Sequence, residues 1–372
     1  MTKRTRENPR PFTVTVPCST ANIGPGFDTL GVGLSMYLRL EVTFEGASGF
    51  TVSYEGDSPH TVPLDPQKNL VTRTAIQTAY SCGQLLPEDI HVKIINPIPL
   101  GRGLGSSGSA VVAGVVLANE ACDLGMDTQR ILDYCLKIEG HPDNITASIL
   151  GGFVASYNRE VSDPAPKYEL SADFKEDYAR RFPNVPAYDT PNLNIGRHLR
   201  LKISSKVKFV VTIPEFELQT KLARSVLPVE YPKGDVIFNI QRVAVLLSSL
   251  ASEEVPDPAV IAEAMHDRVH QKYRQHLVPG LPEILKLSYK TMPGLLGVCV
   301  SGAGPTVLCL ATDHFDTIGK AVCGIFGKHA VAEAANESNG LSYQNGSKGT
   351  AAGIKASYRI LEVSENGFTV TY

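Results

Sequence analysis

The sequence has no tryptophan and only five methionines, and its seven cysteines are scattered without any C-x-x-C pair. An odd, scattered set of cysteines is neither a disulfide framework nor a set with the spacing of a zinc site. We therefore expect reduced thiols and a cytoplasmic protein.

A strong charge of either sign is also missing. Lysine and arginine number 35 against 38 aspartates and glutamates, which gives a net charge of −3. This balance lacks the basic field that a nucleic-acid partner requires, so we expect no nucleic-acid binding.

Long hydrophobic runs are absent as well. The longest apolar candidate, residues 110–118, is far shorter than the roughly 20 residues that span a bilayer, so no membrane association is expected. The first twelve residues are basic but lack an apolar core, which argues against a secretory signal and predicts a solvated arm.

With 372 residues and about 150 residues per domain, the chain predicts two or three domains. Strand and helix patterns are mixed throughout, which indicates an α+β protein in two parts. The charged, proline-containing stretch 158–200 is expected to be an excursion or a connection between them. Strands are expected at 12–16, 38–44 paired with 49–54, within 90–100, and at 207–213, 297–300 and 307–312, with further strands at the C-terminus. Helices are expected at 69–80, 110–121, 128–139, 217–226, 235–251, 258–274 and 314–328.

A glycine- and serine-rich loop gives the strongest functional signal. Glycine permits close approach of backbone N–H groups to an anion, and the buried helix that follows offers its N-terminus to a phosphate. A glycine-rich turn kept only for packing is the alternative. The candidate ligand-binding residues are Pro99, Leu100, Gly101, Arg102, Gly103, Leu104, Gly105, Ser106, Ser107, Gly108 and Ser109.

Two common phosphate loops do not fit this segment. Residues 103–108 match G-x-G-x-x-G, and Glu120 and Asp123 lie where an acidic residue that binds the ribose is expected. However, the glycines follow Pro97 and Pro99 instead of a smooth strand, and no strand is expected after Asp123. A Walker A loop is excluded because no Lys-Ser or Lys-Thr closes the glycines.

The loop PLGRGLGSSGS instead resembles the nucleotide loop of the GHMP small-molecule kinases. Three further segments are similar to motifs of this family: PCSTANIGPGFDTLG at 17–31, EGHPDNITASILGG at 139–152 and SGAGPT at 301–306. Their order agrees with the homoserine kinases of the family. The resemblance implies a nucleotide-binding domain like domain 2 of ribosomal protein S5 at 12–205, and a ferredoxin-like domain at 206–372.

The resemblance also implies ATP, Mg²⁺ and L-homoserine as ligands, in a homodimer of the threonine pathway. The loop amides would cradle the phosphates, and Asn69 would lie beside the adenine unless it is only a helix N-cap. Ser107, less readily Ser106, and Glu139 would hold the magnesium ion; otherwise Glu139 is an exposed acid at a helix end.

For the zwitterionic substrate, the resemblance assigns Asn22 and Asp28 to the amino-acid contacts, with Asp28 as partner of the ammonium. Arg224 and Arg274 would hold the carboxylate. Thr220 lies four residues before Arg224, on the same face of a helix, and would orient the substrate hydroxyl.

In the turn HPDN, the resemblance assigns His141 and Asn144 to the substrate contacts, whereas we expect Asp143 to be structural. The substrate hydroxyl would then lose its proton late, without a dedicated base; Asp143 as the general base is the alternative. His266 and His270 bracket Asp267, but without a third ligand they predict a helix face and not a metal site. A kinase for mevalonate or a sugar, and a non-catalytic nucleotide-binding regulator, remain the alternatives.

Overall fold

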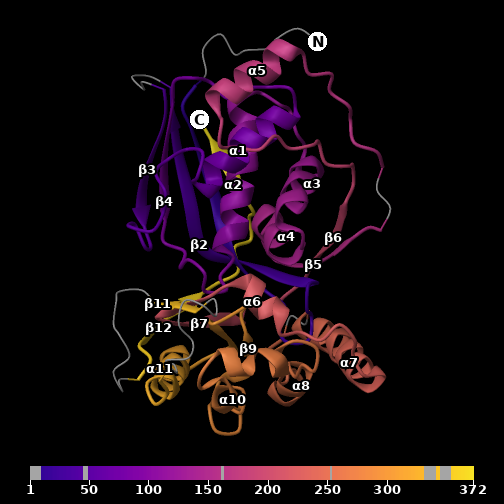
Figure 1. Ribbon diagram of the computed structural model, residues 1–372. Coiled ribbons are helices and arrows are strands. Elements are labelled where there is room, and N and C mark those ends of the chain that lie inside the picture. Colours follow the sequence, from indigo (N-terminus) through magenta and orange to yellow (C-terminus); the bar gives the residue numbers. More distant parts are fainter. Residues whose placement is uncertain (1–9, 45–48, 161–162, 252–253, 331–340, 344–352) are drawn as a thin grey trace.

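The computed structural model describes residues 10–44, 49–160, 163–251, 254–330, 341–343 and 353–372. Most of the basic arm expected at the N-terminus, residues 1–9, lies outside these. The chain forms two halves, one above the other in Figure 1, each with a sheet and helices packed against it. None of the described helices has both the length and the hydrophobicity needed to cross a membrane.

The first sheet has the order β13-β1-β2-β4-β3, and β5 and β6 continue it from one end of β2. Its strands are β1 (Phe12–Ala21), β2 (Leu30–Thr43), β3 (Phe50–Gly56), β4 (Ile90–Asn96), β5 (Phe153–Asn158), β6 (Gly196–Leu201) and β13 (Thr369–Thr371). Its helices are α1 (Leu70–Ser81), α2 (Ser106–Ala121), α3 (Thr128–Glu139), α4 (Asp143–Leu150) and α5 (Ala172–Arg181). Figure 1 shows α1 to α4 gathered beside β1 to β4.

The predicted pairing of 38–44 with 49–54 is wrong. β4 lies between β2 and β3; it is antiparallel to β2 and parallel to β3. A parallel pair needs a crossover connection, and here α1 provides it between β3 and β4. The sequence signal for a turn between the two strands was therefore misleading.

The second half contains the sheet β12-β7-β10-β9 and a two-stranded sheet of β8 and β11. Its strands are β7 (Lys208–Pro214), β8 (Phe216–Leu218), β9 (Leu295–Val300), β10 (Val307–Ala311), β11 (Leu341–Tyr343) and β12 (Ala356–Leu361). Its helices are α6 (Thr220–Ser225), α7 (Lys233–Leu250), α8 (Pro258–Ala264), α9 (Gln271–Arg274), the 3₁₀ turn η1 (Gln275–Leu277), α10 (Leu281–Ile284) and α11 (Phe315–Phe326).

The single helix expected at 258–274 is also wrong, because the structure breaks it into α8 and α9. The Asp267 carboxylate accepts hydrogen bonds from the backbone N–H groups of residues 269, 270 and 271, at 3.0, 2.9 and 2.6 Å. This side chain caps the start of α9, and such local hydrogen bonds compete with a continuous helix. His266 and His270 therefore do not share one helix face.

The stretch 158–200 joins the first half. It contributes α5 and the strand β6, which pairs with β5. The Tyr178 ring on α5 lies 4.3 Å from that of Tyr80 on α1, measured between centroids. The segment is therefore packed structure, which its charge and its prolines concealed.

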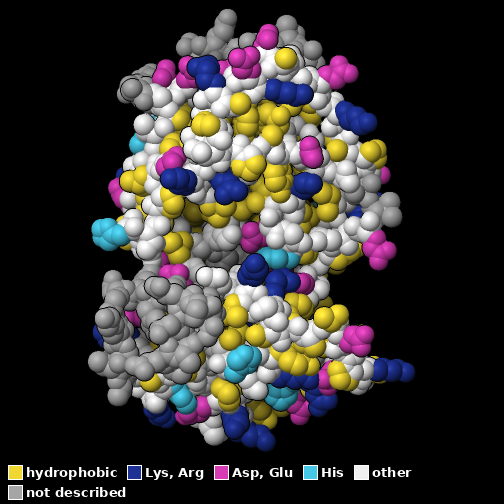
Figure 2. All heavy atoms as spheres, in the orientation of Figure 1, with side chains coloured by type: hydrophobic (Ala, Val, Ile, Leu, Met, Phe, Trp, Pro, Cys, Tyr) yellow, Lys and Arg dark blue, Asp and Glu magenta, His cyan; other side chains and the backbone are white. Residues whose placement is uncertain are grey.

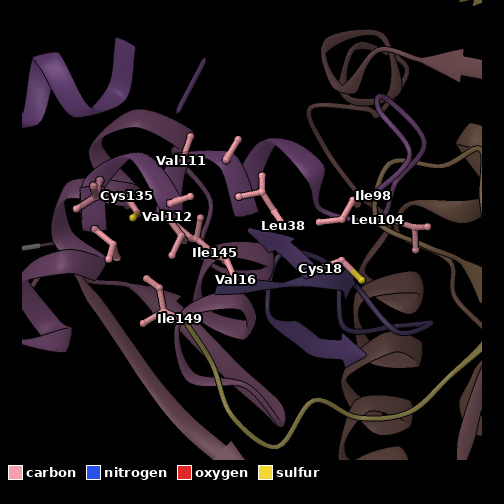
Figure 3. Close-up of a cluster of buried hydrophobic side chains, with 14 of the residues drawn as sticks. Val16, Cys18, Leu38, Ile98, Leu104, Val111, Val112, Cys135, Ile145 and Ile149 are labelled. Atoms are coloured by element: carbon pink, nitrogen blue, oxygen red, sulfur yellow. The ribbon is translucent and has the colours of Figure 1, made fainter. Parts of the chain in front are cut away.

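A continuous core holds the two halves together. It includes Val16 and Val111 of the first half together with Phe209 and Leu308 of the second. Figure 3 shows part of it, where side chains of α2, such as Val111 and Val112, meet those of β1 and β2. α2 is buried around nearly its whole surface, in agreement with its uniformly apolar sequence.

The last strand returns to the first sheet. β13 pairs with β1, and Thr371 lies opposite Thr13. The domain division at 12–205 and 206–372 stays a prediction. In the structure the final strand, β13, belongs to the sheet of the first half.

Candidate active site

The glycine-rich loop connects β4 to α2 and ends in a helix N-terminus without a side-chain cap. Gly105 is the N-cap residue, with a φ of 68°, and within the described residues no side-chain cap is present at the start of α2. Uncapped amides and the positive end of the helix dipole favour a bound anion. The local geometry is therefore that of a phosphate site.

Two of the loop glycines have no room for a side chain. A Cβ on Gly103, where φ is +78°, would lie 2.2 Å from the Ser301 carbonyl oxygen. A Cβ on Gly105 would lie 2.2 Å from the Ser19 Oγ. These contacts explain why glycine is needed where the loop meets its neighbours.

The turn at 301–306 packs directly against this loop from the second half. The Ser301 hydroxyl donates to the Gly103 carbonyl at 2.5 Å, and the Thr306 N–H donates to the Arg102 carbonyl at 3.3 Å. The Asn22 amide donates to the Gly302 carbonyl at 2.8 Å. Three motifs that are distant in the sequence thus meet at one place.

They meet in a cleft between the two halves. Figure 2 shows charged side chains of both signs where the two halves meet. The predicted residues that line it are Asn22, Asp28, Gly101, Arg102, Gly103, Gly105, Ser106, Ser107, Gly108, Glu139, His141, Asn144, Thr220, Arg224 and Arg274. The cleft does not bring in Asn69, Pro99, Leu100, Leu104 or Ser109.

Three of these five residues are structural. Pro99 and Leu104 are buried, and the Ser109 hydroxyl donates to the Pro17 carbonyl at 3.0 Å and to the Gly105 carbonyl at 3.1 Å. They support the loop without facing the cleft.

Asn69 and Leu100 line a second, mainly apolar hollow. It shares Ser106 and Ser107 with the cleft, so the phosphate loop separates the two spaces. Asn69 is the N-cap of α1, because its Oδ1 accepts from the Val71 N–H at 3.0 Å. An apolar hollow next to a phosphate loop suits a nucleotide base.

The two predicted magnesium ligands lie together. The Ser107 hydroxyl donates to Glu139 Oε2 at 3.3 Å, at the start of α2 and the end of α3. Among the described residues, no group of three or more histidine, cysteine or acidic side chains could hold a metal. Two oxygen donors nevertheless fit Mg²⁺, which keeps several waters and binds few protein groups.

Asp28 and Arg224, the expected partners of the two substrate charges, are paired with each other. Arg224 Nη2 and Nη1 lie 2.6 and 2.9 Å from the two carboxylate oxygens of Asp28. Burial works against the Arg224 charge, but the carboxylate outweighs it and raises the pKa of the guanidinium. Thr220 begins α6 and lines the same cleft four residues before Arg224.

The Arg274 guanidinium makes more contacts within the protein than we expect for an arginine that is free to bind a substrate carboxylate. It is 2% exposed, and its Nε donates to the Ala223 carbonyl at 2.9 Å. Its Nη1 contacts His270 Nδ1 at 3.2 Å and the Gly302 carbonyl at 3.0 Å. Burial, with the nearby Arg224 charge, lowers its pKa to about 10.

His270, for which the sequence predicts only a place on a helix face, contacts this arginine and holds it in position. Its ring is fully buried, and Nε2 lies 2.8 Å from the Gly24 carbonyl. Because the carbonyl accepts and arginine only donates, the ring is the neutral Nε2–H tautomer. The ring also stacks on Phe27 at 5.3 Å between centroids. The sequence signal that could have revealed this arrangement is Asp267, a helix-capping residue three positions before His270.

The HPDN turn lies on the other side of the cleft. Asn144 Oδ1 accepts from the Ser19 hydroxyl at 3.0 Å, and the Asp143 carboxylate accepts from the Asn144 N–H at 2.8 Å. His141 Nδ1 lies 3.3 Å from Asp143. Burial disfavours the imidazolium, but Asp143 and Glu139 together raise the pKa of His141.

Known proteins match this chain over nearly its whole length. The family models described as the GHMP kinases N terminal domain and GHMP kinases C terminal match residues 69–152 and 247–329. A homoserine kinase of Schizosaccharomyces pombe is 44% identical, covering 97% of this chain and 99% of that protein. One of Saccharomyces cerevisiae is 42% identical with the same coverage.

Solved structures share the fold. That of homoserine kinase from Cytophaga hutchinsonii superimposes with a TM-score of 0.69 at 23% identity, covering 97% of each chain. A mevalonate kinase of L. major gives a TM-score of 0.56 at 13% identity, covering 94% and 95%. The architecture is therefore the two-domain GHMP kinase fold, and by its full-length relatives the chain belongs to the homoserine kinases of the GHMP kinase superfamily.

Proposed function

We propose that this chain is an ATP-dependent kinase that phosphorylates the hydroxyl of L-homoserine to give O-phospho-L-homoserine, a step of threonine biosynthesis. One observation carries the proposal: a phosphate loop and a pair of opposite charges, Asp28 and Arg224, line the same cleft. The first suits ATP, and the second suits a small zwitterion.

Binding of the nucleotide is assigned to the loop and the two spaces on either side of it. The base occupies the apolar hollow beside Asn69, and the phosphate chain passes along the loop amides and the N-terminus of α2. Ser107 and Glu139 would hold Mg²⁺, and the ion would supply positive charge to neutralise the phosphates.

The amino acid enters between Asp28 and Arg224. Its ammonium pairs with Asp28 and its carboxylate with Arg224, so the charges that now contact each other separate around the substrate. Thr220 and Asn144 orient the hydroxyl. Its oxygen then bonds to the γ-phosphorus while the bond to the bridging oxygen of ADP breaks.

The hydroxyl proton needs no dedicated base in this scheme. Asp143 is 2% exposed, and its carboxylate is held by the Asn144 N–H and by His141. We propose that Asp143 orients Asn144 and that the proton leaves late, to the transferred phosphate.

The test is release of ADP by the purified chain in a coupled assay. We expect turnover with L-homoserine that requires Mg²⁺, and none with mevalonate or galactose, which lack an ammonium group for Asp28. If mevalonate or a sugar were turned over faster than L-homoserine, that compound would be the substrate and the homoserine assignment would be wrong. No ADP release with any of them would favour a non-catalytic nucleotide-binding protein.

We also propose a homodimer. α7 exposes an apolar face that includes Val236, Ile237, Ile240 and Val245, of which Ile240 is 64% exposed. Apolar patches of this kind commonly mark interfaces. Light scattering should give a dimer for the wild type and a monomer for Ile240→Glu, whereas Leu199→Glu, at an equally exposed site on β6, should remain dimeric. A monomeric wild type would contradict this proposal.

A further inference from the structure

Arg102 is a buried arginine, only 6% exposed. In the part of the chain that the structure describes, no atom accepts a hydrogen bond from its buried Nε and Nη2 atoms. Within the described residues, its guanidinium forms no ion pair. The other buried arginine that lines this cleft, Arg274, has three hydrogen-bond acceptors within the protein.

Such a charge is unfavourable unless an anion joins it. Burial of an unpaired charge is strongly unfavourable, and proteins pair buried charges or bind an external ion with them. No carboxylate of the described residues pairs with Arg102, so we infer that its partner is an external anion.

The position of Arg102 indicates which anion this is. It lies between Gly101 and Gly103, in the loop whose uncapped helix N-terminus already suits a phosphate. It lines the cleft that contains Thr220 and Arg224, whereas the apolar hollow on the nucleotide-base side is lined by Gly101 but not by Arg102. Arg102 therefore belongs to the end of the phosphate chain that faces the acceptor.

We propose that the Arg102 side chain binds the terminal phosphoryl group of the nucleotide and stabilises its charge during transfer. The loop lacks the lysine of a Walker A motif, and Arg102 supplies a positive charge from within the loop itself. A guanidinium is suited to this task because its planar fork matches two phosphate oxygens. The inference rests on the proposed kinase function and adds a side-chain role to a loop otherwise assigned to its amides.

The test compares Arg102→Met with Arg73→Met, a control at an exposed arginine on α1 outside both cavities. Calorimetric titration with Mg²⁺ uses AMP and the non-hydrolysable ATP analogue AMPPNP. For Arg102→Met we expect AMPPNP to bind at least ~10-fold more weakly, as when a charge-assisted hydrogen bond is lost. AMP affinity should change less than about twofold, because its phosphate lies at the other end of the chain.

The second readout is thermal stability without nucleotide. Since Met removes an unpaired buried charge, Arg102→Met should melt at or above the wild-type temperature, and AMPPNP should stabilise it less than it stabilises the wild type. The turnover number with homoserine should fall by roughly 100-fold or more, as for other arginines at a transferred phosphoryl group.

Unchanged AMPPNP affinity, or an equal loss for AMP, would overturn the proposal. If Arg102→Met does not fold, Arg102→Lys decides: weaker AMPPNP binding with intact AMP binding supports the role, and no weakening refutes it. The titrations contain no homoserine. A wild type that binds AMPPNP but does not phosphorylate homoserine would therefore refute the proposed function, while Arg102 would still be judged.

Discussion

At the level of single residues, Asp28 and Arg224 give the cleft one negative and one positive charge, and the two side chains contact each other. Both side chains are about one-third exposed, so water can reach them and the pair can open. A zwitterion brings one charge for each partner, whereas an alcohol with a single charge would leave one of them unmatched.

We expect Asp28→Asn to raise the KM for homoserine by roughly 10- to 100-fold, because a hydrogen bond to a charged group contributes about 1.5–3 kcal/mol. The KM for ATP should stay within about twofold, since the phosphate loop is not altered. Steady-state kinetics with each substrate varied in turn measures both. An equal rise in the two constants would contradict the assignment of Asp28 to the ammonium.

The role of Asp143 is tested by Asp143→Asn, which keeps the size of the side chain. If no base is used, the turnover number should fall by less than about tenfold, because general-base catalysis typically contributes 10²–10⁴-fold. A collapse of turnover with intact homoserine binding would instead make Asp143 the base.

His270 predicts a pH dependence of stability. Burial lowers its pKa in the folded protein, while the unfolded chain keeps the usual pKa of about 6.5. As the pH falls from 7 toward the lowered pKa, the unfolded state takes up a proton that the folded state does not. Each such proton costs about 1.4 kcal/mol of unfolding free energy per pH unit.

His270→Gln should remove this contribution. Urea unfolding between about pH 5 and 6.5 should show the wild type losing stability faster than the variant as the pH falls, by up to about 1.4 kcal/mol per unit. His141, whose pKa is raised, acts in the opposite sense but is present in both proteins, so the difference isolates His270. Parallel curves would mean that His270 is protonated in the folded state.

At the level of elements, the sequence predicted those whose pattern is local. The buried helix near 110–121, the strand at 12–16 and the glycine loop follow from hydrophobic periodicity and from glycine spacing, and all are present. Elements set by long-range contacts were missed. The parallel pairing of β3 with β4 depends on α1, and the break between α8 and α9 depends on the carboxylate of Asp267.

The candidate site divides in the same way. The four motifs predicted to belong together do line or support one cleft, because each carries its signature in a few consecutive residues. The partners within the site were not predictable: Arg274 is held by Ala223, His270 and Gly302, contacts that only the folded chain creates.

The contact between the phosphate loop and the turn at 301–306 can be tested with one methyl group. Gly103→Ala places a Cβ against the Ser301 carbonyl, a backbone atom that cannot rotate away, so we expect AMPPNP binding to be lost. Gly125→Ala is the matched control, since its φ is also positive, at +64°, but nothing lies within 4 Å of the added carbon. It should cost only the strain of its backbone, about 1–2 kcal/mol, and keep nucleotide binding.

At the level of the whole molecule, the continuous core makes the two halves depend on each other. Val16 and Phe209, from opposite halves, belong to the same cluster. We therefore expect one cooperative unfolding transition in calorimetry, and we expect a fragment of residues 206–372 to remain unfolded, because its apolar surface would lose its partner. Two separate transitions, or a folded fragment, would show that the halves are independent.

The pairing of Thr13 with Thr371 has a topological consequence. Positions close to the two extremes of the chain lie one strand spacing apart, about 5 Å, so a short peptide could join them and close the polypeptide into a ring. Such a ring, cut at the open turn around Gly125 instead, should fold to the same cleft, since neither the junction nor the cut touches the phosphate loop.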